Sequence, residues 1–214
     1  MCIYIISDDK YFVSGLKIAM AASDTEMKVF NYESGMLLFY YCTFRQEDIV
    51  IVDLNYTRHF QSANVSGNTH YFSVKVVFVV DLPLQGEYSG FHPYWLISKK
   101  CPFKKILPLL KQLTSNDRNQ TEHLSRKENI VLRELAGGRS THFISRKLNL
   151  SAKTISSHKQ NAFRKLGMSR LNDMSLVCYR QIINLYAGFS CTPAGQAGLA
   201  PSLPEKLRSY PLTR

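Results

Sequence analysis

Residues 150–166 constrain the fold of this chain most, because they predict one short helix whose two faces differ in chemistry. Ser151 precedes this helix as a capping residue, and Gly167 is suited to its end. Its apolar face holds Ile155, Ala162, Phe163 and Leu166. Its other face is polar, cationic and free of carboxylates, and it holds Lys153, Ser156, Ser157, Gln160 and Arg164. Such a face fits the major groove of DNA, where hydroxyl, amide and ammonium groups pair with bases and phosphates.

Two further helices are predicted before this one. Ser125 and Glu128 have the spacing of a capping box at the start of a helix over residues 124–136. A pair of glycines ends that helix, and a shorter one begins at Ser140. The residues of the shorter helix that we expect to face inward are Phe143, Ile144 and Leu148. Residues 149–151 then form a tight turn into the groove-facing helix, which completes a helix-turn-helix.

A spaced set of residues in this segment carries a resemblance to a known family: Leu124, Ser125, Glu128, Leu132, Ala136, Gly138, Ser140, Ile144, Leu148, Leu150, Ser151, Lys153, Thr154, Ile155, His158, Lys165, Leu166 and Gly167. The segment resembles the DNA-binding domain of LuxR/FixJ (NarL-type) bacterial transcription regulators over roughly residues 121–187. Lys127 departs from the family pattern, where arginine is usual, so the charge is kept but bidentate hydrogen bonding is lost. Residues 153–159 look most like the enteric capsule-regulator branch.

The outward face of the third helix supplies the predicted DNA contacts. The base contacts are assigned to its N-terminal half, at Ser156, Ser157 and Gln160. Charged and hydroxyl groups suit phosphate without reading sequence, so the phosphate contacts are assigned to Lys153, Thr154, Lys159, Arg164 and, from the preceding helix, Arg146. The alternative is that these side chains are only solvated. For His158, a phosphate contact and an internal packing role both stay open.

Positive charge is concentrated in the same segment. The chain has 214 residues and a formal net charge of +11. Residues 121–187 hold 12 Lys and Arg against 4 Asp and Glu, whereas residues 1–113 hold 11 against 10. The basic excess therefore lies where contact with phosphates requires it.

Cysteine usage and hydropathy predict a reduced, cytoplasmic protein. The cysteines are scattered, without CxxC or Cys/His ligand spacing, at Cys2, Cys42, Cys101, Cys178 and Cys191. We therefore expect neither a zinc site nor a disulfide framework. Two aspartates, Asp8 and Asp9, interrupt the N-terminal apolar run, so no signal peptide is expected. No apolar run approaches the roughly 20 residues that span a bilayer.

Strands and helices alternate over residues 1–113, which predicts an α/β domain with a parallel sheet. The predicted strands cover residues 2–7, 27–30, 48–53, 75–80 and 94–97. The predicted helices cover residues 11–22, 33–44 and 103–113. Functional sites of such sheets lie beyond the carboxyl ends of the strands. We therefore expect one site to hold Asp8, Asp9, Asp53 and Lys99.

That constellation resembles the receiver domain of two-component response regulators. By this resemblance, Asp53 is the phosphoacceptor position, and Asp8 and Asp9 are the positions that hold Mg²⁺. Clustered carboxylates attract a hard cation, which offsets the charge of an incoming phosphoryl group.

Three departures from the receiver pattern favour a vestigial site. Val80 stands where the family has a hydroxyl residue at the end of the fourth strand. The family lysine is matched by Lys99 or Lys100 with a slightly short spacing, and residues 56–73 predict no clear third helix. We interpret residues 1–113 as a degenerate receiver kept for dimerisation. A working phosphoacceptor and a different fold stay open as alternatives.

The chain therefore divides into four predicted segments. Residues 1–113 are the receiver-like α/β domain, residues 114–121 a polar linker, and residues 122–187 the all-α, four-helix LuxR-type domain. Residues 188–214 are rich in Gly, Pro, Ser and Ala and are expected to be disordered. A last helix over residues 171–185 has apolar residues on more than one face. In the resembled family this helix pairs two subunits on DNA, although packing within the domain is the commoner cause of such a pattern.

The sequence predicts a bacterial transcription regulator, not an enzyme, that acts without phosphorylation. We expect it to bind double-stranded DNA as a homodimer, or as a heterodimer with a related regulator, and to alter promoter occupancy by RNA polymerase. No membrane contact and no cofactor are expected, except Mg²⁺ if the receiver site is active. The first alternative is a regulator switched by phosphorylation of Asp53. The others are an Mg²⁺-dependent phosphohydrolase, for which the Asp-x-Asp spacing is lacking, and an RNA-binding module, for which the recognition face lacks an aromatic residue.

Overall fold

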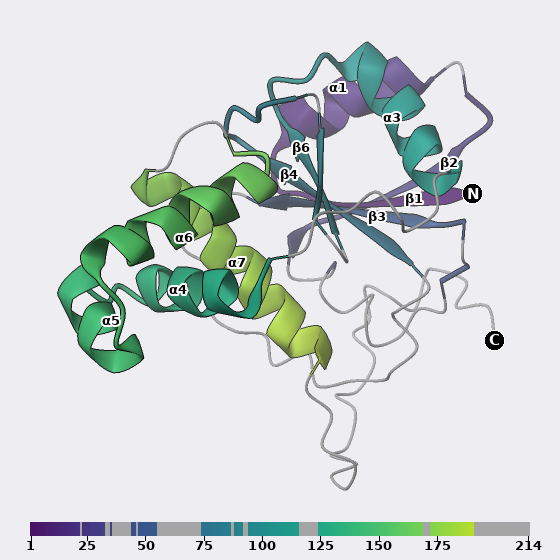
Figure 1. Ribbon diagram of the computed structural model, residues 1–214. Helices are drawn as coiled ribbons and strands as arrows, with labels where there is room; N and C mark the ends of the chain where they lie inside the picture. The colour runs from purple at the N-terminus through teal and green to yellow at the C-terminus, as the bar shows by residue number, and fades with distance from the viewer. Residues whose placement is uncertain are drawn as a thin grey trace, which may run out of the picture.

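The computed structural model describes residues 1–21, 23–32, 35, 44–45, 47–54, 74–86, 88–91, 94–115, 124–168 and 172–190 (Figure 1). The strands are β1 Cys2–Ile6, β2 Glu26–Phe30, β3 Ile49–Leu54, β4 Lys75–Val80, β5 Tyr88–Phe91 and β6 Tyr94–Ser98. The described helices are α1 Lys10–Met20, α3 Phe103–Ser115, α4 Arg126–Ala136, α5 Thr141–Leu148, α6 Ala152–Lys165 and α7 Asp173–Ser190. None of these helices is long and apolar enough to cross a lipid bilayer.

All six strands form one sheet in the order β2-β1-β3-β4-β6-β5. The first five strands of this row run parallel to one another, which confirms the predicted α/β class. The edge strand β5 runs antiparallel to β6 and was not predicted. It is only four residues long and contains Gly90, so the apolar pattern that marks the other strands is missing from it.

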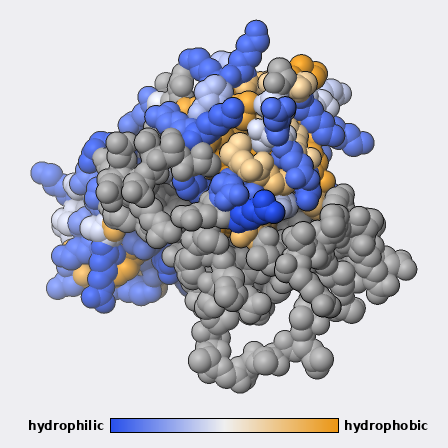
Figure 2. Space-filling model, turned by 90° about the vertical axis from the view of Figure 1, so that its right-hand side faces the viewer, coloured by the Kyte–Doolittle hydropathy of each residue, from blue (hydrophilic) through white to orange (hydrophobic). Residues whose placement is uncertain are grey.

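Side chains of the sheet alternate between its two faces, as the pleat of a β-strand requires. Ile3 and Ile5 belong to a hydrophobic cluster with the inward residues of α1 and α3, whereas Tyr4 and Ile6 belong to a second cluster. Gly15 lets α1 and α3 approach closely, because a Cβ there would lie 2.5 Å from the ring of Phe103. Figure 2 shows that hydrophilic side chains dominate the described surface on the side of the chain's N-terminus, around a smaller apolar patch.

The four helices α4 to α7 form the predicted helix-turn-helix segment. The capping box is present, since the Ser125 hydroxyl accepts from the Glu128 backbone and the Glu128 carboxylate accepts from the Ser125 backbone. A small core of Val131, Ile144 and Ile155 holds α4, α5 and α6 together. The expectation that Phe143 faces inward was wrong, because 45% of its surface is exposed. The guanidinium of Arg139 lies over its ring instead, 5.2 Å from the ring centroid.

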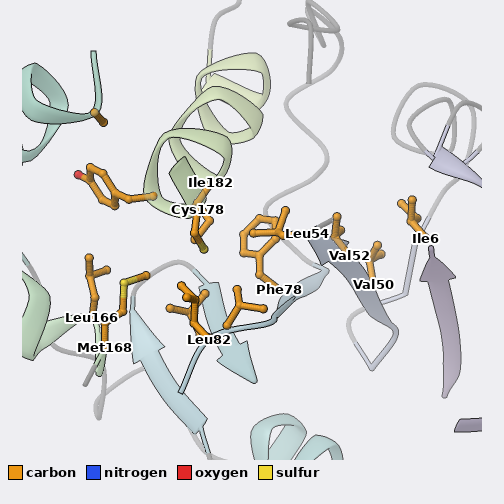
Figure 3. Close-up of a cluster of buried hydrophobic side chains, with 14 of the residues drawn as sticks. Ile6, Val50, Val52, Leu54, Phe78, Leu82, Leu166, Met168, Cys178 and Ile182 are labelled. Atoms are coloured by element: carbon orange, nitrogen blue, oxygen red, sulfur yellow. The ribbon is translucent and has the colours of Figure 1, made fainter. Parts of the chain in front are cut away.

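The second face of the sheet and the helical segment share one hydrophobic cluster, which the sequence did not predict. Figure 3 shows Cys178 and Ile182 of α7 beside Leu54 and Phe78 of the sheet. All four side chains are almost completely buried. The two segments therefore pack against each other directly.

Several predicted bounds differ from the structure. Helix α3 continues to Ser115, two residues into the segment assigned to the linker, and residues 116–123 lie outside the described residues. Helix α7 runs to Ser190, three residues into the expected tail, and residues 191–214 are not described. Most of the predicted helix over residues 33–44 and all of residues 56–73 also lie outside the described residues.

Candidate DNA-binding face and carboxylate site

The turn before the recognition helix α6 and the capping residue at its start fix where this helix begins. Asn149 adopts a left-handed conformation with φ of 51°, which turns the chain sharply after α5. The Ser145 hydroxyl donates to the carbonyl of Leu150 at 2.6 Å and holds this turn. Ser151 then caps α6 by accepting from the Thr154 N–H at 3.1 Å. The turn and the cap confirm the helix start that the sequence predicted.

The polar face of α6 points away from the protein. Among the predicted contacts on α6, four side chains are exposed: Lys153, Ser157, Gln160 and Arg164. Thr154, Ser156 and Lys159 are half-buried, and Arg146 of α5 is exposed. The Thr154 and Ser151 hydroxyls are hydrogen-bonded to each other at 2.8 Å, and the Ser157 hydroxyl donates to the Lys153 carbonyl at 3.1 Å. The hydroxyls of Thr154 and Ser157 therefore already have hydrogen-bond partners in α6 or in its capping residue.

A partly buried ion pair that the sequence analysis missed joins the end of α6 to the start of α4. The Lys165 ammonium lies 3.0 Å from the Glu128 carboxylate, whose side chain is 7% exposed. Burial alone would raise the pKa of Glu128, but the Ser125 backbone N–H and the Lys165 ammonium outweigh burial and lower it. Glu128 and Lys165 both belong to the set of residues that match the resembled family, and this shared match could have indicated that they interact.

The predicted carboxylate site also forms at the carboxyl ends of the strands. The Lys99 ammonium lies 2.9 Å from Asp53 and 2.9 Å from Asp9, and so bridges the two carboxylates. Asp53 is completely buried, and its other carboxylate oxygen accepts from the Ser7 hydroxyl at 2.6 Å. Asp8 is exposed and accepts from the backbone N–H of Tyr32 at 3.1 Å. The structure therefore brings Asp9, Asp53 and Lys99 together and leaves Asp8 at the rim.

Two residues of this site, Ser7 and Tyr32, were missed in the sequence. The Tyr32 hydroxyl donates to the Asp53 carbonyl, and burial together with Asp53 and Asp8 raises the pKa of Tyr32. Burial likewise raises the pKa of Asp53, against the Ser7 hydroxyl and Lys99. Burial would lower the pKa of Lys99, but its two carboxylate partners hold that pKa above its ordinary value.

The residues present do not fit a bound Mg²⁺ ion in this arrangement. The Lys99 ammonium already lies between Asp9 and Asp53, where it neutralises them. The Asp9 carboxylate also caps α1 by accepting from the backbone N–H groups of Tyr11 and Phe12. Among the residues that the structure describes, no three His, Cys, Asp or Glu side chains form a group that could hold a metal ion.

Comparison with known proteins identifies the family. The model described as "Bacterial regulatory proteins, luxR family" matches residues 122–179. The transcriptional regulatory protein RcsB of Escherichia coli K12 is 30% identical over 167 residues, which cover 76% of this chain and 72% of RcsB. The chain belongs to the luxR family of bacterial regulatory proteins. It is a DNA-binding transcription regulator of this type, and the RcsB relatives are named as regulators, not as enzymes.

Other relatives of this luxR-family chain match less of it or match more loosely. The fimbriae Z protein of Salmonella typhimurium is 49% identical over 51 residues, which cover 24% of each chain. A solved RcsB–DNA complex has a TM-score of 0.45 at 20% identity, over 84% of this chain and 96% of RcsB. Full-length FixJ from B. japonicum has a TM-score of 0.32 at 13% identity, over 85% of this chain and 97% of FixJ.

Proposed function

We propose that this regulator reads promoter DNA through the exposed face of α6. Ser156, Ser157 and Gln160 contact base edges, while Lys153, Thr154, Lys159, Arg164 and Arg146 contact phosphates. One observation carries the proposal: the side of α6 opposite the buried Ile155 and Phe163 is polar, cationic and carboxylate-free. Thr154 and Ser157 exchange their internal hydrogen bonds for contacts with DNA, whereas Gln160 is exposed before DNA binds.

Substitutions on α6 test which residues read sequence. Gln160→Ala should weaken discrimination between a specific site and a scrambled one by roughly 1–3 kcal/mol, because a base contact is lost. Lys159→Ala should weaken binding to both DNAs alike, since a phosphate contact is independent of sequence. Competition binding on the two DNAs measures both effects. Equal loss on both DNAs for Gln160→Ala would show that it does not contact a base.

We also propose that the protein acts on DNA as a pair of subunits, either two copies of this chain or this chain with a related regulator. One solved structure of the RcsB relative is described as two RcsB dimers bound to two parallel DNAs, and this arrangement is a property of RcsB. Occupying paired half-sites then alters access of RNA polymerase to the promoter.

Regulation is proposed to be independent of phosphorylation. The arrangement that supports this is the closed carboxylate site, in which Asp53 is buried and paired with Lys99. Val80 is buried at the end of β4 and has no hydroxyl to sense a phosphoryl group. A phosphoryl group would shift the equilibrium between two conformations only if it bound one of them more tightly than the other. The hydroxyl that would provide such a difference is absent at Val80.

The substitution Asp53→Asn separates this proposal from the phosphorylation-switched alternative. Promoter activity in a reporter assay should stay within about twofold of wild type, an effect below roughly 0.5 kcal/mol. The amount of folded protein has to be measured in parallel, because Asp53 pairs with Lys99 in the interior. Collapse of regulation at an unchanged protein level would favour the phosphorylation switch.

A further inference from the structure

The sheet face opposite α1 and α3 is apolar, and the side chains on it include Ile6, Val52, Leu54 and Phe78. Among the described residues, α7 and the end of α6 cover this face (Figure 1). Figure 3 shows Leu82, which follows β4, lying next to Leu166 and Met168, which follow α6. Leu82 is 6% exposed and Met168 is 3% exposed, so water is excluded between them. The burial of these side chains stabilises contact between the two domains.

Backbone hydrogen bonds fix the same contact in register. Leu84 and Met168 form an antiparallel bridge. The backbone N–H of Gln85 donates to the Gly167 carbonyl at 2.8 Å, and the Gln85 side-chain amide approaches the Met168 carbonyl at 3.5 Å. Hydrogen bonds restrict direction as well as distance, so they add a defined orientation to the apolar contact. The segment that joins α6 to α7 is therefore held directly on the loop after β4.

This contact leaves the recognition face open. Lys153, Ser157 and Gln160 remain exposed in the full chain, with the first domain in place. The side of α6 opposite the recognition face is apolar, and its Ala162, Phe163 and Leu166 belong to the cluster shared with the sheet. Docking of the two domains and contact of α6 with DNA are therefore compatible.

Tyr32 lies between the carboxylate site and the docked helix. Its hydroxyl donates to the Asp53 carbonyl, and its ring packs against the shared cluster. The thiol of Cys178 on α7 is close enough to contribute to the raised pKa of Tyr32. A change in the position of Tyr32 would therefore alter the packing of α7 directly, without involving the linker between the domains.

We propose that the first domain holds the helix-turn-helix domain in a fixed, DNA-competent orientation, with the sheet face as the docking surface for α7. This inference rests on the proposed DNA binding through α6. It differs from two other arrangements: a domain that swings freely on a linker, and a first domain that blocks the recognition helix until it is released. The docked state is the state that binds DNA.

A reversible crosslink tests this directly in the full chain. Leu84→Cys with Met168→Cys places two thiols on antiparallel partners, whose Cα atoms lie about 4.5–5.5 Å apart, within the span of a disulfide. Cys42→Ser and Cys191→Ser remove other cysteines from the background. The oxidised protein should bind promoter DNA within about threefold of the same protein after reduction.

The crosslink experiment separates the proposed function from the proposed docking, and two outcomes would overturn the docking. DNA binding by the reduced protein tests the proposed function, and the ratio between oxidised and reduced protein tests the docking. A loss of more than about tenfold on oxidation would show that DNA binding requires the domains to separate, and would overturn the inference. Failure of the folded protein to form the disulfide would also overturn it, because the two segments would not then be in contact.

A second pair of variants does not depend on the crosslink. Leu82→Glu places a carboxylate in the docking contact, whereas Ile18→Glu makes the same change on α1, where the side chain is 78% exposed. Wild type and Ile18→Glu should unfold in one calorimetric transition, and Leu82→Glu in two. Two separate transitions in wild type, unchanged by Leu82→Glu, would show that the domains are not docked.

Discussion

At the scale of single residues, ionised side chains with defined partners hold both functional regions in place. In the first domain, Lys99 forms ion pairs with both Asp9 and Asp53. In the helical domain, Lys165 of α6 forms an ion pair with Glu128 of α4. The sequence indicated that Asp53 and Lys99 would meet, because both lie at the carboxyl ends of parallel strands of one sheet. It did not indicate the Ser7 hydroxyl, because serine after a strand is common and its partner lies 46 positions away.

The lowered pKa of Glu128 predicts a pH-dependent stability. Its contribution is present above the ordinary pKa of 4.5 and is lost as the pH falls through the lowered pKa. Glu128→Gln should therefore lower the free energy of unfolding at pH 7 by about 1–3 kcal/mol, and the difference from wild type should shrink below pH 4.5. Denaturant unfolding at several pH values measures this.

Glu134→Gln is the matched control for that measurement. Glu134 pairs with Lys147 at 2.6 Å, but the lysine side chain is 51% exposed, so solvent screens the pair. The control should change stability by less than about 1 kcal/mol at any pH. A constant difference between Glu128→Gln and wild type over the whole pH range would contradict an electrostatic role for Glu128.

At the scale of secondary-structure elements, the sequence predicted those helices and strands that have a capping residue or an apolar run of their own. The capping residues Ser125 and Ser151 marked the starts of α4 and α6, and the apolar runs marked β1, β3 and β4. The edge strand β5 lacks such a run, and among the described strands it pairs with β6 alone. The docking of α7 on the sheet could not be predicted either, because apolar residues on two sides of a helix do not identify the surfaces that cover them.

The turn between α5 and α6 should tolerate only residues that adopt a left-handed conformation. Asn149→Val should lower stability by roughly 1–2 kcal/mol, because a β-branched residue is strained at φ of 51°. Asn149→Gly should stay close to wild type, since glycine adopts this conformation without strain. Thermal unfolding compares the two variants. Equal destabilisation by valine and glycine would mean that the asparagine side chain, and not the backbone angle, is what matters.

At the scale of the whole molecule, charge is separated between the two parts of the chain. Residues 121–187 carry most of the net charge of +11, while residues 1–113 are nearly neutral. This separation was evident from the sequence, and it favours a DNA-binding surface on the helical domain. The arrangement of the two parts was not evident, because it depends on contacts between residues more than 80 positions apart, such as Gln85 and Met168.

The concentration of charge predicts steep salt dependence of DNA binding by the full chain. Each phosphate contact releases bound counterions and contributes a slope of about −0.9 in log affinity against log salt concentration. Four cationic contacts, Lys153, Lys159, Arg164 and Arg146, should together give a slope of about −4. Lys159→Ala should reduce its magnitude by about 0.9, and an affinity independent of salt would contradict phosphate binding through these residues.

Covering the sheet with the last helix has a consequence for synthesis on the ribosome. The strands are complete once Ser98 has been made, but Ile182 of α7 follows some 80 residues later. Translation adds about 5–20 residues per second, so the apolar sheet face that α7 covers stays uncovered for roughly 4–16 seconds. During that interval the nascent chain exposes a surface suited to chaperones and to aggregation. A protein built in this way reaches its final stability only after α7 has been made.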